Sequence, residues 1–508
     1  MPRAASADYL LAIDLGSSRV KCIVASNRGR ILGQSSADWA PETPTDVAPW
    51  GKEYDPTRTW QLIAGLVRRA LKSARVRASQ VTAVGATSQR EGIALLDGQG
   101  DDLYLGPNTD VRAFFEGQAL DDERGADIYI VTGHAPSFLF APAKLRWFRD
   151  NRPELFERIH TVLSLDAWVT HRLCGALSIE RAAAGEIGLL DVGSGDYPTN
   201  LLSDLGVPRQ TLPELVDAGT VIGRVTSAAS TATGLAAGTP VVAAGPDTQC
   251  GLLGMGAAQC GDVGIVAGWS APVQMVLDKP EVDEKGRTWS GLHLLPKTWI
   301  LESSATEAGG AYRWIADMLA VTGTQDPHGT IDRLAGRTPP GAEGVLAFLG
   351  PRASDMRDIG PRWGGLLFPV PLTAGPVGRG QLFRATLENL AFALKANVGQ
   401  LERIADVPVR QIGFGGGLAG GRTLARILAN VLERPVRHFR GAEVTALGAA
   451  MCTATGAGLF ATLKEAVAAM KARSRIVTPD PLLSLEYREH YERWLAVDEG
   501  MAPLRDRL

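Results

Sequence analysis

The chain has 508 residues, of which 45% are hydrophobic and 21% are charged, and its formal net charge at pH 7 is −3. This length is too great for one ordinary hydrophobic core, so about two to four domains are expected. The composition is typical of a globular protein, and the slightly acidic balance gives no reason to expect a nucleic-acid partner, which would favour a basic face.

Cysteine usage and the N-terminus indicate the compartment. Five cysteines are spread along the chain without a CxxC pair, which argues against a disulfide framework and a structural zinc site. Reduced thiols are typical of the cytoplasm, and the first residues lack the apolar core of a signal peptide. The most apolar stretch, roughly 235 to 277, is interrupted by prolines and aspartates, so no membrane span is expected. We therefore expect a cytoplasmic protein without a membrane partner.

The first half of the chain alternates strand-like and helix-like segments. A glycine turn, Leu15 to Ser18, separates the first two strands, and Asn27 to Gly29 forms the next turn. Strands are predicted at Leu10 to Asp14, Val20 to Ala25, Ile31 onward, Val81 to Ala86 and Ile93 to Asp97, and helices at Thr59 to Lys72, Lys144 to Arg149 and Pro153 to Ile159. This alternation predicts a mostly parallel sheet covered by helices.

The second half repeats the opening pattern of strand, glycine turn and strand at Val263 to Leu277, which hints at internal duplication. The domain junction is placed between about residues 250 and 262, and the segment from 325 to 380, rich in Gly, Pro and Arg, is predicted to be loops. Further predictions are a helix at Gly380 to Ile404, a strand at Gln411 to Phe414, and helices at Thr423 to Leu432 and Ala446 to Gly456.

The first candidate motif is IDLGSSRVK, from Ile13 to Lys21. A glycine between two strands lets backbone N–H groups approach a phosphate, and two serine hydroxyls and a lysine add donors and charge. Asp14, at the end of a buried strand, is suited to hold Mg²⁺ through water. The alternative is a hairpin turn in which the aspartate is only a cap.

The second candidate motif is TSQREG, from Thr87 to Gly92. Arg90 can donate hydrogen bonds to sugar hydroxyl groups, and Glu91 can accept them. The alternative, preferred when this motif is taken alone, is a local ion pair on a loop.

The third candidate motif is AGPDTQCG, from Ala244 to Gly251. Asp247 follows an apolar strand and precedes a helix rich in small residues, where a carboxylate could take the proton from an attacking hydroxyl group. The alternative is that Asp247 is a helix N-cap.

The fourth candidate motif is FGGGLAGG, from Phe414 to Gly421. It matches the GxGxxG pattern of a dinucleotide fold, so an NAD-dependent oxidoreductase is a competing hypothesis. Its late position and the basic Arg440 about 20 residues on oppose that hypothesis, and it leaves the three upstream motifs unexplained. Glycines that let a loop lie flat over adenosine explain the run equally well. No Walker A sequence occurs, which excludes a P-loop kinase.

Taken in order, these motifs resemble the FGGY carbohydrate kinases over roughly residues 8 to 460. PNTDVR (107 to 112), KLRWFRDNRPELF, SLDAWVTHRLCG, LFRATLENLAFAL and EVTALGAAMCTATG add to the resemblance. It implies an α/β fold with two actin-like (ribonuclease H-like) domains and an interdomain cleft. The N-terminal, substrate-binding domain would span 8–255, the C-terminal, nucleotide-binding domain 260–460, and a helical appendage 461–508.

The resemblance also implies roles for individual residues, with ATP and Mg²⁺ as cofactors. Asp14 would organise Mg²⁺ through water, and Asp247 would be the general base and contact the substrate. The remaining roles are substrate binding by Arg90, Glu91 and Asp110, and binding of ATP and its phosphates by Gly16, Ser17, Ser18, Lys21, Gly268, Ser270, Gly416 and Gly417.

The implied activity is ATP-dependent phosphorylation of a hydroxyl group on a small sugar, ketose or polyol. REG, TDVRA and LEN are most similar to the autoinducer-2 kinase branch, and also to glycerol kinases, so one alternative acceptor is a linear dihydroxy-pentanedione. Another alternative is a nucleotide-binding regulatory homologue with weakened transfer. That alternative is motivated by Trp269, where the family usually has a threonine. Gly421 and Asn430, where the family usually has a polar residue and an aspartate, are further departures that bear on the nucleotide contacts. A homodimer is left open.

Overall fold

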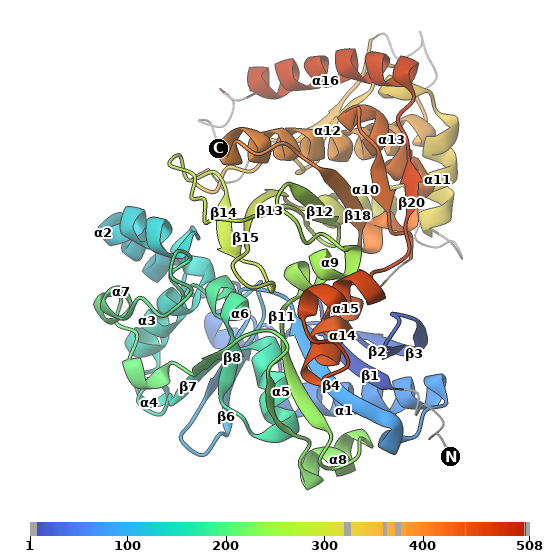
Figure 1. Cartoon of the computed structure of the whole chain (residues 1–508). Helices are drawn as coiled ribbons and strands as arrows, with labels where there is room; N and C mark the ends of the chain where they lie inside the picture. Colours follow the sequence, from blue (N-terminus) through green and yellow to red (C-terminus); the bar gives the residue numbers. More distant parts are fainter. Residues whose placement is uncertain are drawn as a thin grey trace, which may run out of the picture.

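The computed structural model describes residues 8–319, 327–358, 363–370, 377–441, 443–501 and 503. Its two largest sheets are formed by different halves of the chain. We call the parts built on them the N-terminal unit and the C-terminal unit; Figure 1 shows the N-terminal unit in the lower half of the view. The predicted α/β architecture with two units is confirmed. The prediction of a mostly parallel sheet is wrong, because antiparallel strand pairs outnumber parallel ones in both large sheets.

The N-terminal unit is built on a six-stranded sheet. In sheet order its strands are β10 (Val221–Arg224), β11 (Pro240–Pro246), β4 (Val81–Ser88), β1 (Tyr9–Leu15), β2 (Arg19–Ser26) and β3 (Ile31–Asp38). β1 and β11 both pair in parallel with β4, whereas β1, β2 and β3 form an antiparallel meander. The carboxyl ends of β1, β4 and β11 therefore lie side by side.

Helices pack on this sheet and bury its apolar strands. α1 (Pro56–Ala74) packs on β2 and β3, and its buried stripe includes Ile63, Val67 and Leu71, as the sequence pattern predicts. Asp55 caps this helix by accepting a hydrogen bond from the backbone N–H of Arg58.

The rest of the N-terminal unit lies beside the six-stranded sheet. It holds a three-stranded sheet of β5 (Ile93–Leu96), β6 (Asp102–Gly106) and β7 (Thr161–Ser164), and the short pair β8 (Ser178–Glu180) and β9 (Glu214–Val216). Its helices are α2 (Phe114–Thr132), η3 (Ser137–Leu139), α3 (Ala141–Asn151), α4 (Pro153–Phe156), α5 (Leu165–Cys174), α6 (Arg181–Glu186), α7 (Thr199–Asp204) and α8 (Ser227–Thr233).

The C-terminal unit is built on a seven-stranded sheet. Its order is β14 (Trp289–Leu292), β15 (Trp299–Ala305), β13 (Ala271–Leu277), β12 (Asp262–Val266), β18 (Gln411–Gly415), β19 (Val436–His438) and β20 (Arg475–Val477). β12 pairs antiparallel with β13 and parallel with β18, which repeats the relation of β1 to β2 and β4. Its helices are α10 (Ala308–Met318), α11 (Pro327–Arg337), α12 (Arg379–Ala405), α13 (Arg422–Leu432) and α16 (Pro481–Met501).

Two helices connect the units. α9 (Asp247–Met255) follows β11 and leads toward β12, and α14 (Val444–Gly456) packs on α9 and on β1, β4 and β11. Thus α14 follows the strands of the C-terminal sheet in sequence but lies against the N-terminal one, as Figure 1 shows near β1 and β4. Small residues permit this approach, because a Cβ on Gly448 would come within 1.8 Å of the Cys250 carbonyl oxygen.

The chain then returns to the C-terminal unit through α15 (Leu463–Met470). The last segment, predicted to be a helical appendage, contains α15 and α16 and also β20, which pairs with β19. Tyr487 and Trp494 of α16 are almost fully buried in the core of the C-terminal unit.

The prediction that residues 325 to 380 form only loops is wrong. The segment contains α11 and the paired strands β16 (Leu346–Phe348) and β17 (Gly365–Leu367). Ile331 and Ala335 form a buried i, i+4 pair on α11, although the helix is otherwise rich in Gly and Arg. Residues 325–326, 359–362 and 371–376 lie outside the described residues.

Candidate active site

Three predicted motifs meet at one edge of the N-terminal sheet. Asp14 of β1 and Gly245 of β11 both stand opposite Thr87 of β4 in the strand register. Arg90 and Glu91 follow β4 directly, and Asp247 follows β11. Because the carboxyl ends of neighbouring parallel strands form the usual binding edge of an α/β sheet, this edge is the candidate active site.

The turn into α9 places Asp247. Gly245 has φ 110°, and a Cβ there would lie 2.8 Å from a carboxylate oxygen of Glu180, so the turn requires glycine. The Thr87 hydroxyl donates to the Gly245 carbonyl at 2.7 Å and fixes the turn. Pro246 occupies the N-cap position and Asp247 is the first helical residue, so the alternative of Asp247 as the N-cap is wrong.

Asp247 and Asp14 are both buried carboxyl groups with raised pKa values. Burial raises the pKa of Asp247 to about 7, against the opposing effect of Arg90 and with a further rise from Asp14. Burial likewise raises the pKa of Asp14 to about 7, although Lys21 opposes the shift. A carboxyl group whose pKa lies near neutral pH is well suited to exchange protons with a substrate.

The first phosphate loop is held by contacts from outside the motif. Trp39 donates its indole N–H to the Gly16 carbonyl at 2.8 Å, and the Ser17 hydroxyl lies 3.1 Å from the Asn108 side-chain nitrogen. Ser18 is exposed. The amino group of Lys21 lies 2.6 Å from Glu443, immediately before α14, so a carboxylate far along the chain orients this lysine.

Arg90 joins the two units. Its guanidinium donates two hydrogen bonds to Glu302 of β15, at 2.6 and 2.9 Å. It also lies 3.3 Å from Glu186 and 3.6 Å from Glu91. Arg90 is therefore not confined to a local ion pair with Glu91 on one loop, because its main partner, Glu302, belongs to the C-terminal unit.

Glu91 is held in an uncommon conformation. Its φ of 58° lies in the left-handed region, where a non-glycine residue is strained and is often functional. The buried amino group of Lys144 donates to the Glu91 backbone carbonyl at 2.9 Å and stabilises the turn. Burial raises the pKa of the Glu91 carboxyl group to about 8, against the effect of Arg90.

The sequence analysis missed several polar neighbours of Arg90. The Gln249 amide donates to Glu186 at 2.5 Å, the Gln274 amide donates to Glu302 at 2.7 Å, and His134 lies 3.6 Å from Glu186. The Trp289 ring covers Arg90, with 5.3 Å from the guanidinium carbon to the ring centroid. Gln274 could have been noticed as the single polar residue of the apolar strand β13, and Glu302 as the single charged residue of β15. His134 is buried as well.

Asp110 lies in a separate polar cluster. Its fully buried carboxylate accepts hydrogen bonds from the Tyr104 hydroxyl at 2.5 Å, the Lys52 backbone N–H at 2.7 Å and the Arg112 side chain at 2.9 Å. These bonds hold the loop that also carries Asn108 beside Ser17. Direct contact between Asp110 and substrate stays a prediction.

In the C-terminal unit, too, the predicted loops follow neighbouring parallel strands, β12 and β18. Gly268 follows β12, and its N–H donates to the Ser270 carbonyl at 2.8 Å. Gly416, after the neighbouring parallel strand β18, has φ 89°, and a Cβ there would lie 2.5 Å from the Ala267 carbonyl oxygen. Gly417 and Gly268 are exposed. The two predicted nucleotide loops are therefore adjacent, and Gly416 must be glycine.

The departures at Gly421 and Asn430 have structural causes. A Cβ on Gly421 would lie 2.6 Å from a carboxylate oxygen of Asp332, which accepts the backbone N–H of Thr423 at the start of α13. The side-chain oxygen of Asn430 accepts the backbone N–H of Asp480 at 2.7 Å, ahead of α16. Both residues therefore take part in contacts within the C-terminal unit.

Trp269, in the loop between β12 and β13, packs against the first turn of α10. The residue is 59% exposed, and a Cβ on Gly310 would lie 3.0 Å from its ring. The backbone N–H of Gly309 donates to the Trp269 carbonyl at 2.7 Å, so the loop and α10 are joined at this point.

We expect Trp269→Thr to raise kcat with little change in the KM of the hydroxyl substrate. Threonine removes the bulk beside the phosphate loop and supplies a hydroxyl donor. Steady-state kinetics of both proteins make the comparison, with melting temperature as the control for folding. A lower kcat, or a raised KM for ATP, would instead make the indole a required wall of the nucleotide site.

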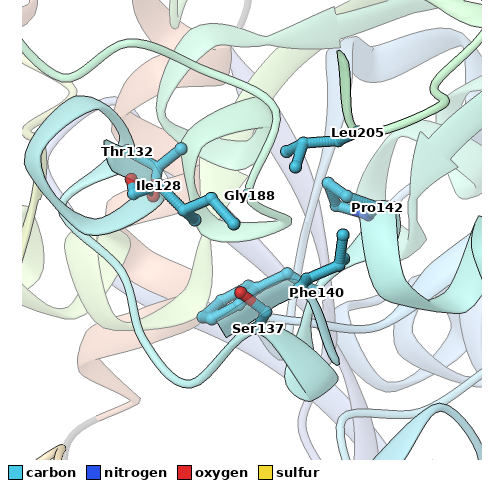
Figure 2. Close-up of a pocket in the computed structure, with 8 residues that line it drawn as sticks. Ile128, Thr132, Ser137, Phe140, Pro142, Gly188 and Leu205 are labelled. Atoms are coloured by element: carbon cyan, nitrogen blue, oxygen red, sulfur yellow. Dashed lines mark hydrogen bonds between the residues drawn. The ribbon is translucent and has the colours of Figure 1, made fainter. Parts of the chain in front are cut away.

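A small cavity elsewhere in the N-terminal unit is not a substrate site. It has a volume of about 10 Å³ and lies among α2, η3 and α3, where Ile128, Phe140 and Leu205 point into it (Figure 2). Such a space holds at most about one water molecule.

Comparison with known families decides the identity. The model for the N-terminal domain of the FGGY family of carbohydrate kinases matches residues 9–254, and the model for its C-terminal domain matches residues 264–457. The chain belongs to the FGGY family of carbohydrate kinases.

Relatives of this FGGY kinase cover nearly its whole length. It is 31% identical to an autoinducer-2 kinase from Klebsiella pneumoniae subsp. pneumoniae, over 96% of this chain and 93% of the relative. A xylulose kinase structure from Rhodospirillum rubrum matches with a TM-score of 0.83 and 25% identity, over 98% of this chain and 99% of that one. A Plasmodium falciparum glycerol kinase with ADP gives the same TM-score at 16% identity, over 98% of each chain, which shows the shared fold.

The two-domain, actin-like fold and the kinase class predicted from the motifs are thus confirmed. This FGGY kinase is a phosphotransferase that uses ATP and acts on a hydroxyl group of a small carbohydrate-type substrate. The NAD-dependent oxidoreductase hypothesis for the Gly415–Gly420 run is set aside. None of the helices in the part of the chain that the structure describes combines the length and hydropathy that a membrane span requires.

Proposed function

We propose that Asp247 acts as the general base in phosphoryl transfer from ATP to a hydroxyl group of a small neutral polyhydroxylated molecule. The observation that carries this proposal is the strand register, which brings Asp14, Arg90 and Asp247 to one edge of the sheet. Phosphoryl transfer needs in-line positioning, charge neutralisation and a base near the attacking hydroxyl. Asp247 supplies the base and takes the hydroxyl proton as the oxygen attacks the γ-phosphorus.

The phosphate groups of ATP are assigned to the loops of both units. Gly16, Ser17, Ser18 and Lys21 would contact them from the N-terminal unit, and Gly268 and Ser270 from the C-terminal unit. Gly416 and Gly417 would lie along the adenosine, because they follow the strand next to β12. ATP then lies between the units, where their closure excludes water.

Mg²⁺ fits the donor set at the sheet edge. The charge of Asp14 adds to the rise in the pKa of Asp247 that burial causes, and a divalent cation would relieve this repulsion. In the described ranges of the chain no group of three or more His, Cys, Asp or Glu is arranged to hold a metal ion. One or two carboxylates together with substrate phosphates are the usual Mg²⁺ environment in kinases. Asp14 would hold the ion through water, and the ion would neutralise charge on the transferring group.

Arg90, Glu91 and Asp110 are assigned to the hydroxyl substrate. Glu91 follows β4 and Asp247 follows the neighbouring strand β11, and Asp247 is near enough to raise the pKa of Glu91, so a molecule bound at Glu91 would present a hydroxyl group to Asp247. Arg90 is hydrogen-bonded to Glu302, so its main role would be to position the neighbouring carboxylates, with direct contact to the substrate as a smaller role. Asp110 would act mainly by fixing the loop next to Ser17. We also place the enzyme in the cytoplasm, where the five free cysteines would stay reduced.

The relatives named autoinducer-2 kinase favour one particular acceptor, a linear dihydroxy-pentanedione. An ADP-release assay with Mg²⁺ and ATP should therefore compare this compound with a panel of neutral polyols and ketoses. We expect ADP release that depends on at least one neutral acceptor, with NAD reduction as the negative control. Absence of acceptor-dependent ADP release across the panel would contradict the proposal and favour a regulatory homologue with weakened transfer.

A further inference from the structure

Three fully buried polar atoms close to Arg90 have no hydrogen-bond partner among the described residues. They are Oε1 of Glu91, Nε2 of His134 and Oε1 of Gln274. Buried polar atoms are nearly always paired, so a group of unpaired ones at a candidate active site calls for a ligand. The three residues come from three segments and belong to both units, since Gln274 lies on β13.

The three atoms surround one charged cluster. Glu91 and Glu186 both contact the Arg90 guanidinium, and His134 lies 3.6 Å from Glu186. Gln274 reaches the same guanidinium through Glu302, to which its amide donates at 2.7 Å. The His134 and Trp289 rings are 5.3 Å apart between centroids, and Trp289 also covers Arg90.

The state of the His134 ring follows from its backbone contact. Nδ1 lies 2.7 Å from the Thr132 carbonyl oxygen, which can only accept, so Nδ1 carries the proton. In the neutral ring Nε2 is then an acceptor, and its nearest acidic neighbour, Glu186, is another acceptor beyond hydrogen-bond distance. Nε2 of His134 therefore has no hydrogen-bond donor among the described residues.

The hydrogen-bonding roles of the Gln274 amide follow from its neighbours in the same way. Its nitrogen donates to Glu302 and, at 3.1 Å, to the Thr248 hydroxyl, so Oε1 is left as an acceptor. Glu91 Oε1 accepts when the carboxyl group is ionised and can donate when it is protonated. A hydroxyl group can match all three atoms, whereas a carboxylate can only accept and would face three glutamates.

We propose that His134 and Gln274 bind hydroxyl groups of the acceptor substrate, one from each unit, and select a neutral polyhydroxylated molecule over a sugar acid. This inference rests on the proposed function and names the acceptor class of that site. Arg90 offers no excess positive charge to an anionic acceptor, because three carboxylates, those of Glu91, Glu186 and Glu302, already surround its guanidinium group. The side chains of Arg90 and Glu91 are each 10% exposed, against 2–3% for Glu186 and Glu302, so the acceptor approaches from their side.

Two variants test the inference in the full-length enzyme. His134→Asn keeps a side-chain N–H near the position of Nδ1 but removes Nε2, and Gln274→Met keeps the volume but removes the amide. For the best neutral acceptor of the panel we expect KM to rise about tenfold in each variant, with KM for ATP unchanged. His171→Asn is the matched control, because both nitrogens of that ring face backbone carbonyls of Ala176 and Gly100, away from Arg90.

Monodeoxy analogues of that acceptor give a readout that a merely structural role would not move. The wild type should discriminate against an analogue that lacks the hydroxyl bound at His134 or Gln274, and the matching variant should lose that discrimination. Aldonates should be poor acceptors for the wild type. Wild-type KM values and undiminished discrimination in both variants would overturn the inference, as would efficient phosphorylation of an aldonate.

Calorimetric binding of the neutral acceptor, with a non-hydrolysable ATP analogue present, separates this inference from the proposed function. Acceptor binding without phosphoryl transfer would contradict the proposed function, and the inference would then be decided by the affinities of the two variants. No binding of any neutral polyhydroxylated compound to the wild type would overturn both.

Discussion

Replacing Asp247 with asparagine should lower kcat by roughly 10²- to 10⁴-fold while the protein still folds and binds ATP. The amide has nearly the same shape as the carboxylate but cannot take the proton from the attacking hydroxyl group. Because Pro246 is the N-cap of α9, the substitution disturbs no cap, and the melting temperature should change little. Thermal unfolding and kcat measured on one preparation make this test.

Asp217→Asn is the matched control for Asp247→Asn. Asp217 is an exposed aspartate that pairs with Arg181 at the surface of the N-terminal unit, so kcat should stay at the wild-type value. Near-wild-type turnover of Asp247→Asn itself would move the role of general base to another group.

Replacing Arg90 with methionine should lower the free energy of unfolding by about 3–5 kcal/mol, because it leaves buried carboxylates without their cation. Glu302 and Glu186, each no more than 3% exposed, lose their main positive partner. Burial acts to raise the pKa of Glu186, but Arg90 holds it at about 2. Denaturant unfolding measures the change.

The double variant Arg90→Met with Glu302→Met is the informative partner experiment. Replacing both members of a buried ion pair by apolar residues is often nearly neutral, so the double variant should recover part of the lost stability. Equal stability of wild type and Arg90→Met would mean that the bond between the units contributes nothing to folding.

Much of the fold could be predicted from local signals. Apolar runs such as Leu10 to Asp14 and Val241 to Ala244 identify buried parallel strands, and glycine turns mark their ends. α12 was predicted to within a residue at each end because its apolar period is long and regular. α11 was missed because its Gly and Arg content resembles a loop, and the two buried positions Ile331 and Ala335 are too few to outweigh that signal.

The edge that holds the candidate active site was predictable for the same reason, since each of its motifs stands at the end of one strand. The partners of Arg90 were not. Glu302 lies 212 residues further along the chain, and no local pattern says which charge a buried glutamate will meet. The sequence around His134 gave no sign that a single backbone carbonyl would fix its tautomer and leave Nε2 without a donor. Such facts depend on how the two units pack.

The position of α14 also bears on how the protein is made on the ribosome. One face of the N-terminal sheet, including Leu10, Ala12 and Ile23, is covered by residues such as Ala446 and Ala450. All of the strands of that sheet leave the exit tunnel long before residues 444–456 are translated. The apolar face of this sheet therefore stays exposed to solvent while most of the second half is synthesised. Exposed apolar surface of this kind is what chaperones bind. The nascent chain completes its first unit only when its last helices emerge.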